Sequence, residues 1–322
     1  MQQAFPKVYI LVLNFNNWDD SRGCLESIFK IDYPNYEVVF IDNGSADNSL
    51  AKAKAWVTDK TPLTIIETGK NLGYAGGNNA GMKYALEKDD FGYLWILNND
   101  VVVTKDALGL MVKHMQETPK AGICGCAILQ SDKPNEILTM ASTYRPWFAH
   151  PLYIEGYRPY DLAKLKQYQE IEKRMDLVSG ASVLVTKEFI NVVGLMSEDY
   201  FLQFEELDWA IRGRRKKFTL ALEPRAIVYH KCGATFSQIE GALKGKQTIY
   251  KRTHDRYNTR GRLLFTWKFY PYFLPTVYLA LIGDIYDRIK VGAFDNVSIM
   301  LEEIGHHFST PFRWLARQLR KN

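Results

Sequence analysis

The feature that most constrains the fold of this chain is an alternation, through its first half, of short apolar runs with segments of helical periodicity. Five runs rich in β-branched residues have the length of buried strands, at 8–14, 36–42, 63–67, 93–97 and 121–129. Between them lie helix-period stretches at about 19–30, 46–57, 78–88 and 105–117. Strands separated by helices predict an α/β fold, a mostly parallel sheet with helices on both faces.

Polar residues follow three of these predicted strands. Asn14 ends the first, Asp42 ends the second, and Asn98, Asn99 and Asp100 follow the fourth. Ligands of parallel sheets bind beyond the carboxyl ends of the strands, so these side chains are candidate site residues. An unpaired carboxylate between the apolar runs "YLWIL" and "VVV" would cost free energy. Asp100 and Asn98 can offer oxygen ligands to a divalent cation, and an Asx turn is the alternative interpretation.

The segment "NLGYAGGNNAGMKYA", residues 71–85, is rich in glycine. We expect Gly73, Gly76 and Gly77 to lie just before a helix, where they would let backbone N–H groups approach a phosphate. The segment is not a Walker loop, because no Gly-Lys-Ser/Thr follows, and its position excludes the dinucleotide fingerprint. A glycine-rich turn is the alternative. Asp42, in "VFIDNGSADNS", similarly fits either a nucleoside contact or a turn with a helix cap.

The second half is less regular. Residues 130–175 form a long excursion of the kind that often makes lids or acceptor loops. The elements expected after the excursion's helical patch near 161–174 are a strand at 176–185, a helix at 201–217 and two short strands within 218–230, broken at Glu223-Pro224.

The helix at 201–217 contains an acidic cluster, "EELDW". Glu205 and Asp208 share one helix face, and Glu206 is turned by ~100° from Glu205. Asp208 and Arg212 are spaced i, i+4, so an ion pair explains part of the cluster. One arginine cannot account for three acids, although four further basic residues follow closely: Arg214, Arg215, Lys216 and Lys217.

The basic charge is concentrated in the C-terminal quarter. Residues 241–322 hold 14 Lys+Arg against 6 Asp+Glu, in a chain whose formal net charge is +5. We divide the chain into an α/β domain at 1–238 and a helical region at 239–322. We expect the helical region either to bind a membrane surface or to form a packing or homodimer contact. Its aromatic residues include Trp267, Phe269, Tyr270, Tyr272, Phe273, Tyr278 and Tyr286. The longest apolar run, 269–283, is shorter than the ~20 residues of a membrane-spanning helix.

Cysteine usage bears on the compartment. Four cysteines (Cys24, Cys124, Cys126 and Cys232) without an N-terminal signal peptide favour reduced thiols and a cytoplasmic location. We expect a protein at the inner face of the cytoplasmic membrane or free in the cytoplasm, and no nucleic-acid partner.

The order of these motifs resembles family 2 of the glycosyltransferases, inverting enzymes with the GT-A nucleotide-sugar fold. The resemblance covers about residues 7–235 and includes "IDNGSADNS", "NLGYAGGNNAG", "LNNDV", "SGASVLVTKEFINVVGLMSEDYFLQFEELDWAIR" and a late histidine. Within the family, the chain is most similar to the rhamnosyltransferase-like and galactofuranosyltransferase-like members of bacterial surface polysaccharide synthesis. The segment 250–265 is similar to the Tyr- and Arg-rich segment that follows the family's catalytic domain.

The resemblance implies a role for each motif. Asp100 stands at the last acid of the family's D-x-D metal motif, where Asn98 replaces the first acid, and His230 would be a further ligand of Mg²⁺ or Mn²⁺. Glu206 occupies the catalytic base position, but the family's Glu-Asp is here Glu-Glu, which leaves Glu205 as the alternative. Asp208 and Trp209 would face the acceptor. The residues implied to border the nucleotide-sugar are Asn14, Asp42, Gly73, Gly76, Asn78, Asn98 and Asn99.

The resemblance thus implies a metal-dependent inverting glycosyltransferase. It would move a sugar from a UDP- or dTDP-sugar to a hydroxyl of a glycan acceptor that we expect to be lipid-linked. A sugar nucleotidyltransferase is one alternative, although the first strand lacks that class's basic, glycine-rich loop. A non-catalytic glycan- or nucleotide-binding protein is the other alternative.

Overall fold

The computed structural model describes residues 5–58, 61–231 and 252–319, with side chains described up to residue 308. The chain divides into two compact units. Described residues 5–144, 152–201 and 205–231 belong to the first unit, and 145–151, 202–204 and 252–319 belong to the second. The domain boundary predicted at 238/239 lies outside the described residues, as does Cys232.

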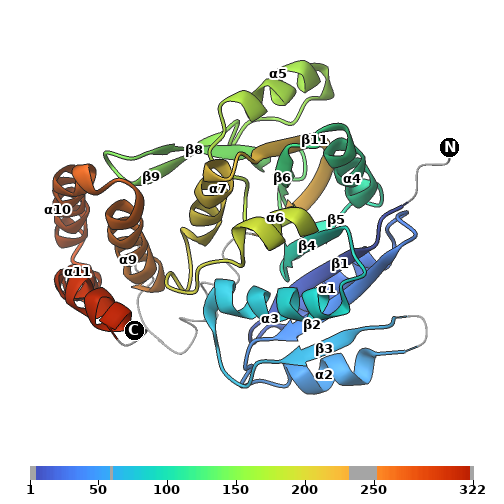
Figure 1. Ribbon diagram of the computed structural model, residues 1–322, viewed down its shortest axis with the longest axis horizontal. Helices are drawn as coiled ribbons and strands as arrows, with labels where there is room; N and C mark the ends of the chain where they lie inside the picture. Colours follow the sequence, from blue (N-terminus) through green and yellow to red (C-terminus); the bar gives the residue numbers. More distant parts are fainter. Residues whose placement is uncertain (1–4, 59–60, 232–251, 320–322) are drawn as a thin grey trace. The chain divides into compact units, whose positions relative to one another are not determined.

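The first unit is built on a curled, mixed sheet (Figure 1). Among the described residues it has nine strands in the order β3-β2-β1-β4-β10-β6-β11-β5, with β7 on β6. The pairs β1–β2, β1–β4, β2–β3 and β6–β11 are parallel, whereas β10, β5 and β7 run antiparallel to their neighbours. The strands are β1 (Val8–Asn14), β2 (Tyr36–Asp42), β3 (Thr64–Glu67), β4 (Tyr93–Asn98), β5 (Val101–Val103), β6 (Ala121–Gln130), β7 (Ile137–Thr139), β10 (Ser182–Thr186) and β11 (Thr219–His230).

Successive residues of a strand point to opposite faces of the sheet, and both sets are apolar here, so helices cover both faces. Val8, Ile10 and Val12 pack in one core, with α1 (Trp18–Ile28), α2 (Ser49–Trp56) and α4 (Ala107–Glu117). Tyr9 and Leu11 pack in the other, with α3 (Gly73–Lys88), α6 (Lys187–Val193) and α7 (Glu205–Arg215). The α/β fold and the five strands of the first half are therefore confirmed.

The excursion after β6 contains the predicted helical patch. Its strands β8 (Ala141–Arg145) and β9 (His150–Ile154) form a separate two-stranded sheet. They are followed by η1 (Leu162–Lys164), α5 (Leu165–Gln169) and η2 (Glu170–Lys173). His114 of α4 and Glu172 of η2 hold the patch, with 2.6 Å between Nε2 and Oε1.

Several predicted boundaries were wrong. Helix α3 begins at Gly73, so Gly76 and Gly77 lie inside it and do not precede it. Their lack of a side chain serves helix–sheet packing, since a Cβ on Gly77 would lie 2.4 Å from Leu13 Cδ1. Residues 219–230 form one strand and not two, because the register shifts between Glu223 and Ile227 and the resulting bulge accommodates Pro224. The strand expected at 176–185 begins only at Ser182, and the helix expected at 201–217 begins at Glu205.

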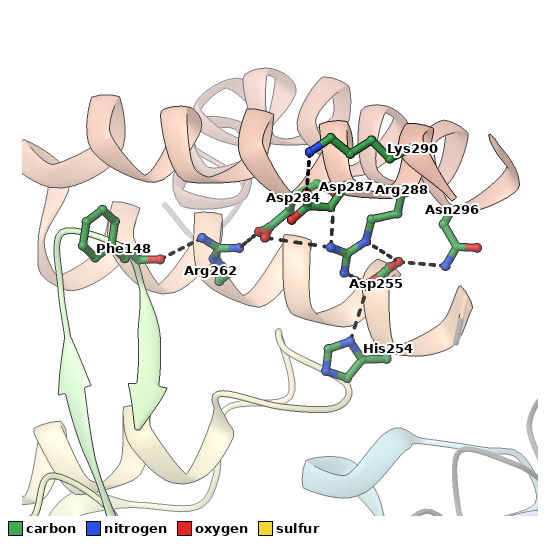
Figure 2. A network of polar contacts seen from close by, with 9 residues as sticks. All are labelled: Phe148, His254, Asp255, Arg262, Asp284, Asp287, Arg288, Lys290 and Asn296. Carbon is green, nitrogen blue, oxygen red and sulfur yellow. Dashed lines mark hydrogen bonds and ion pairs between the residues drawn. The ribbon is translucent and has the colours of Figure 1, made fainter. Parts of the chain in front are cut away.

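The second unit is helical, as predicted for the C-terminal region. It contains α9 (Arg252–Phe269), η3 (Pro271–Phe273), α10 (Leu274–Lys290) and α11 (Phe294–Leu319). A polar network joins the three helices (Figure 2). Arg288 Nη2 donates to Asp255 Oδ1 at 2.8 Å, Asn296 Nδ2 donates to Asp255 Oδ2 at 2.7 Å, and Arg262 donates to Asp284 at 2.5 Å. Within the described part of the chain, no helix is both long enough and apolar enough to cross a membrane.

The network changes the interpretation of the basic charge. Arg252 pairs with Asp295, Arg256 with Glu302 and Glu303, Arg262 with Asp284, and Arg288 with Asp255. These arginines are therefore not a free basic surface. What α10 exposes instead is an apolar row at positions i, i+3, i+7 and i+10, made of Leu279, Ile282, Tyr286 and Ile289.

Candidate functional site

The carboxyl ends of the central strands gather buried polar side chains. In the sheet register, Asn14 of β1 lies opposite Asp42 of β2, and Leu13 lies opposite Asn98 of β4. Asn14 Nδ2 donates to Asp42 Oδ1 at 3.2 Å and to Ser45 Oγ at 3.0 Å. Because the strands are parallel, residues far apart in sequence meet at one edge of the sheet, as the sequence predicted.

Asn99 belongs to the same edge but is used within the protein. Its Nδ2 lies 2.9 Å from Ser21 Oγ, 3.3 Å from the Asn17 carbonyl and 3.4 Å from Asn14 Oδ1. Ser21 Oγ in turn donates to Asn14 Oδ1 at 2.8 Å. These contacts fix the start of α1 against the strand edge, so Asn99 positions other site residues. Ser21 and Ser45 were not identified from the sequence, because nothing in their local pattern distinguishes them.

Asp100 and His230 form the next part of the site. The antiparallel pairing of β5 with β11 sets Val101 opposite His230. As a result His230 Nε2 lies 3.1 Å from Asp100 Oδ1, and the Asp100 side chain is only 1% exposed. Among the described residues Asp100 Oδ1 has no hydrogen-bond partner. This contact is an ion pair when His230 is protonated. A carboxylate oxygen and an imidazole nitrogen are also ligand types of divalent cations, so the pair is compatible with the predicted metal site.

The glycine-rich segment borders this edge from α3. Gly73 has φ +73° and would place a Cβ 2.2 Å from the Phe201 carbonyl oxygen, so the position requires glycine. Asn78 is fully buried, and its Nδ2 donates to the Tyr74 carbonyl at 3.0 Å. Its Oδ1 has no hydrogen-bond partner among the described residues. Gly76 lies near Leu72, whose Cβ would be 2.8 Å from an added Cβ.

Asn43 organises the same segment and was missed from the sequence. Its Nδ2 donates to Asn71 Oδ1 and to the Gly73 carbonyl, both at 3.1 Å, and its Oδ1 accepts from the Leu72 N–H at 3.0 Å. Its position directly after Asp42, at the end of a strand, could have identified it as a site residue. The turn-like composition of "DNGSADNS" gave the segment a simpler explanation.

The acidic cluster lies in the first turn of α7. Glu205 is 1% exposed, whereas the Glu206 side chain is only partly buried. A Cβ built on Gly180 would lie 1.8 Å from Glu206 Oε1, so this carboxylate stands directly against the Gly180 backbone. Burial raises the pKa of Glu206 to about 6. Tyr74 lies beside both, and its hydroxyl donates to the Gly180 carbonyl at 2.6 Å.

A backbone contact connects this cluster to the strand edge. Asn98, two residues before Asp100, donates its N–H to the carbonyl of Ala181 at 3.1 Å, and Ala181 directly follows Gly180. The structure therefore brings the predicted base and the predicted metal ligands to the same end of the sheet.

Asp208 and Trp209, expected on the acceptor side, are used in packing. Asp208 accepts from Arg212 Nε at 2.5 Å and from the Tyr200 hydroxyl at 3.0 Å. Trp209 is fully buried, and its Nε1 donates to the Gly194 carbonyl at 2.8 Å. These contacts hold α7 against the segment around Gly194, and we therefore assign neither residue to the acceptor.

Sequence comparisons identify relatives of this chain. The sequence model of glycosyl transferase family 2 matches residues 9–182. The chain is 21% identical over 304 residues to the low-salt glycan biosynthesis hexosyltransferase Agl10 of Haloferax volcanii, covering 88% of this chain and 92% of that protein. It is 22% identical over 228 residues to the poly-beta-1,6-N-acetyl-D-glucosamine synthase of Staphylococcus epidermidis, covering 70% of this chain and 50% of that longer protein.

Solved structures share the fold. GalNAc-T7 with UDP, GalNAc and Mn²⁺ matches with a TM-score of 0.60 and 14% identity, over 96% of this chain and 58% of that one. The mannosyltransferase PcManGT from Pyrobaculum calidifontis, in complex with GDP-Man and Mn²⁺, matches with a TM-score of 0.56 and 15% identity, over 97% and 83%. At such identities the likeness shows the fold alone, which is the predicted GT-A arrangement.

Proposed function

This chain belongs to glycosyl transferase family 2, and from that premise we propose that it is a metal-dependent, inverting enzyme of glycan biosynthesis. It would transfer a sugar from a UDP- or dTDP-sugar to a hydroxyl of a lipid-linked glycan, as rhamnosyltransferase-like members do. The observation that carries the proposal is the convergence of Asp42, the Asp100–His230 pair and Glu206 at one end of the sheet.

The donor would lie along the strand edge. Asp42 and Asn14 would contact the nucleoside, and Gly73, Gly76, Asn78 and Asn98 would border the diphosphate and the sugar. The buried Asn78 Oδ1 without a partner among the described residues supports a ligand contact there. Asp100 and His230 would hold Mg²⁺ or Mn²⁺, which when bound would neutralise charge on the leaving diphosphate.

Glu206 would act as the general base. Its carboxylate accepts the proton of the acceptor hydroxyl while that oxygen attacks the anomeric carbon, and the bond to the diphosphate breaks on the opposite face. A single displacement of this kind inverts the anomeric configuration. The raised pKa of Glu206, about 6, supports this role because it brings the carboxylate close to the basicity that proton transfer near neutral pH requires. Glu205 is more deeply buried and is the weaker candidate.

The second unit would provide attachment to a lipid surface. The exposed row Leu279, Ile282, Tyr286 and Ile289 on α10 has the composition of a helix face that enters the headgroup region. Phe294, Leu301 and Phe308 repeat every seven residues along α11 and are also exposed. A lipid-linked acceptor would then be met at the inner face of the cytoplasmic membrane.

Product analysis tests the reaction class. Purified protein would be incubated with UDP-, dTDP- and GDP-sugars and extracted lipid-linked acceptors, and the products analysed by mass spectrometry and NMR. We expect transfer that EDTA abolishes, and a product of opposite anomeric configuration to the donor. Formation of a nucleotide-sugar from a sugar phosphate and a nucleoside triphosphate would instead identify a nucleotidyltransferase. Donor binding without any turnover would identify a non-catalytic binding protein.

The metal assignment has its own test. We predict that Asp100→Ala abolishes Mn²⁺-dependent donor binding and that His230→Ala weakens it, measured by calorimetry with and without Mn²⁺. Asp106→Ala is the matched control, because Asp106 is exposed and makes no side-chain cap bond to α4. Unchanged Mn²⁺ dependence in both site variants would contradict the assignment.

A further inference from the structure

Gly180 occupies a place where the backbone does not require glycine. It lies just before β10, and its φ is not among the positive values that favour glycine in this chain. An added Cβ would lie 1.8 Å from Glu206 Oε1 and 2.9 Å from Glu206 Cδ, so a side chain at this position would require the Glu206 carboxyl group to move. The carboxyl group of Glu206 thus fills the volume that a side chain at 180 would occupy.

Tyr74 closes the same volume from the side of α3. Its hydroxyl oxygen lies 3.3 Å from the position of that added Cβ and donates to the Gly180 carbonyl at 2.6 Å. Its backbone N–H donates to the Phe201 carbonyl at 2.7 Å, in the segment that leads into α7. Burial and the neighbouring charges of Glu206 and Glu205 raise the pKa of Tyr74, so the phenol keeps the proton that it donates.

We propose that Gly180 and Tyr74 are positioning residues for the Glu206 carboxylate. The inference rests on the proposed function, in which Glu206 is the base. Glutamate carries its carboxyl group one methylene further from the helix than aspartate would. Because Gly180 has no side chain, there is room for the Glu206 carboxylate at this distance from the helix. The hydrogen bond from the Tyr74 hydroxyl to the Gly180 carbonyl fixes the backbone that the carboxylate contacts. A base must be held to within a fraction of an ångström, so both residues contribute to turnover without touching the donor.

The first test is Gly180→Ala. The new methyl group displaces the Glu206 carboxylate, so we expect kcat to fall by about 10²-fold, with the donor KM and the circular dichroism spectrum unchanged. Gly109→Ala in α4 is the control, because an added Cβ there meets nothing within 4 Å. Wild-type kcat in Gly180→Ala would overturn the inference.

The second test separates positioning from a general structural role. Glu206→Asp withdraws the carboxyl group from the Gly180 backbone and so removes its clash with a methyl group introduced at that position. We expect the double variant Gly180→Ala/Glu206→Asp to have a kcat no lower than that of Glu206→Asp alone. The effects of the two substitutions on kcat would then not be additive in a double-mutant cycle. Additive losses would mean that Gly180 acts independently of Glu206, and would overturn the inference.

Tyr74→Phe provides an independent measurement. Loss of the hydroxyl admits water beside Glu206, so the acidic limb of kcat/KM should move to lower pH while kcat falls. An unmoved limb with unchanged kcat would remove Tyr74 from the proposal. The parent function fails separately: if Glu206→Gln turns over normally, Glu206 is not the base, whereas an inactive Glu206→Gln beside a fully active Gly180→Ala refutes the positioning alone.

Discussion

Glu206 and Asp208 lie two positions apart on α7 in opposite electrostatic surroundings. Asp208 is fully buried, and its carboxylate accepts hydrogen bonds from the Arg212 guanidinium and the Tyr200 hydroxyl. Glu206 leans on a glycine backbone, and burial raises its pKa to about 6. We therefore expect these two carboxylates to have different roles: Asp208 holds the helix in place, and Glu206 is the residue proposed to take a proton.

This difference predicts the pH dependence of turnover. The base must be deprotonated to act, and because its pKa is raised, activity should be lost as the pH falls through about 6 and not near 4.5. Glu206→Gln should lower kcat by ~10²-fold or more, leave donor affinity intact and remove this acidic limb. Steady-state kinetics between about pH 5 and 8 measure both effects. Glu205→Gln is the comparison, and loss of turnover in that variant alone would move the base by one residue.

At the scale of single residues, the sequence identified which positions meet but not what each one contacts. Asp100 could be proposed from its place after a strand, whereas the roles of His230 and Glu206 were implied only by the resemblance to the family. Tyr74 could not, because its partner Gly180 is far away along the chain and the tyrosine looks like one more aromatic residue of a helix. The resemblance implied that Trp209 faces the acceptor, whereas its ring is buried in the core beside Phe189.

At the scale of elements, the packing of α9 on α10 includes a buried ion pair between Asp255 and Arg288. Burial alone would raise the pKa of Asp255, but hydrogen bonds from His254, Arg288 and Asn296 outweigh it and lower the pKa to about 2, from 3.8. Because the folded pKa is the lower one, the pair stabilises the helices above about pH 4, and this contribution is lost as the pH falls towards 2. The shift corresponds to about 2 kcal/mol.

We therefore predict that Asp255→Asn destabilises α9 and α10 by about 2 kcal/mol or more at pH 7, because it removes the nearer of the two anions of Arg288 and leaves only Asp284 at 3.9 Å. Hydrogen exchange of peptides from these helices should show the loss, and the difference from wild type should shrink below about pH 4. Asp287→Asn is the control, since Asp287 is exposed and lies 4.0 Å from Lys290. Equal exchange in Asp255→Asn and wild type would contradict the proposed role of the pair.

Element types followed from periodicity, while element boundaries depended on packing partners. Glycine in sequence indicates a turn, yet Gly77 lies within α3, where Leu13 of the sheet occupies the space that a side chain would need. Proline likewise predicts a strand break, yet β11 continues through Pro224 by a bulge. In both cases the deciding contact comes from a distant part of the chain, which local pattern cannot show.

At the scale of the whole molecule, the prediction concerns attachment to lipid. We expect the full-length protein to co-sediment with anionic liposomes, and Leu279→Gln/Ile282→Gln to weaken this by at least about tenfold, because two apolar side chains leave the bilayer surface. The control is Val192→Gln, an exposed apolar residue of α6. No sedimentation of the wild type with anionic or neutral vesicles would leave the row as a packing or homodimer contact.

Salt should act in a graded way. Four arginines of the second unit are held in ion pairs within the protein and are not free to bind anionic lipid: Arg252, Arg256, Arg262 and Arg288. The apolar row would therefore supply a part of the binding, and salt does not screen that part. We expect high salt to reduce sedimentation without abolishing it. The sequence predicted a basic helical region, but the distribution of its charge could not be predicted, because pairing depends on which helix faces meet.

The pairing of β5 with β11 also bears on how the protein is made. Asp100 is synthesised early, and His230 comes only at the end of β11, the last sheet strand in the described part of the chain. Their meeting closes a long loop and is a late, non-local event in folding. A growing chain on the ribosome that has not yet passed residue 230 lacks one of the two groups proposed to hold the cation. Nucleotide-sugar chemistry would therefore be withheld from incomplete chains until β11 has joined the sheet.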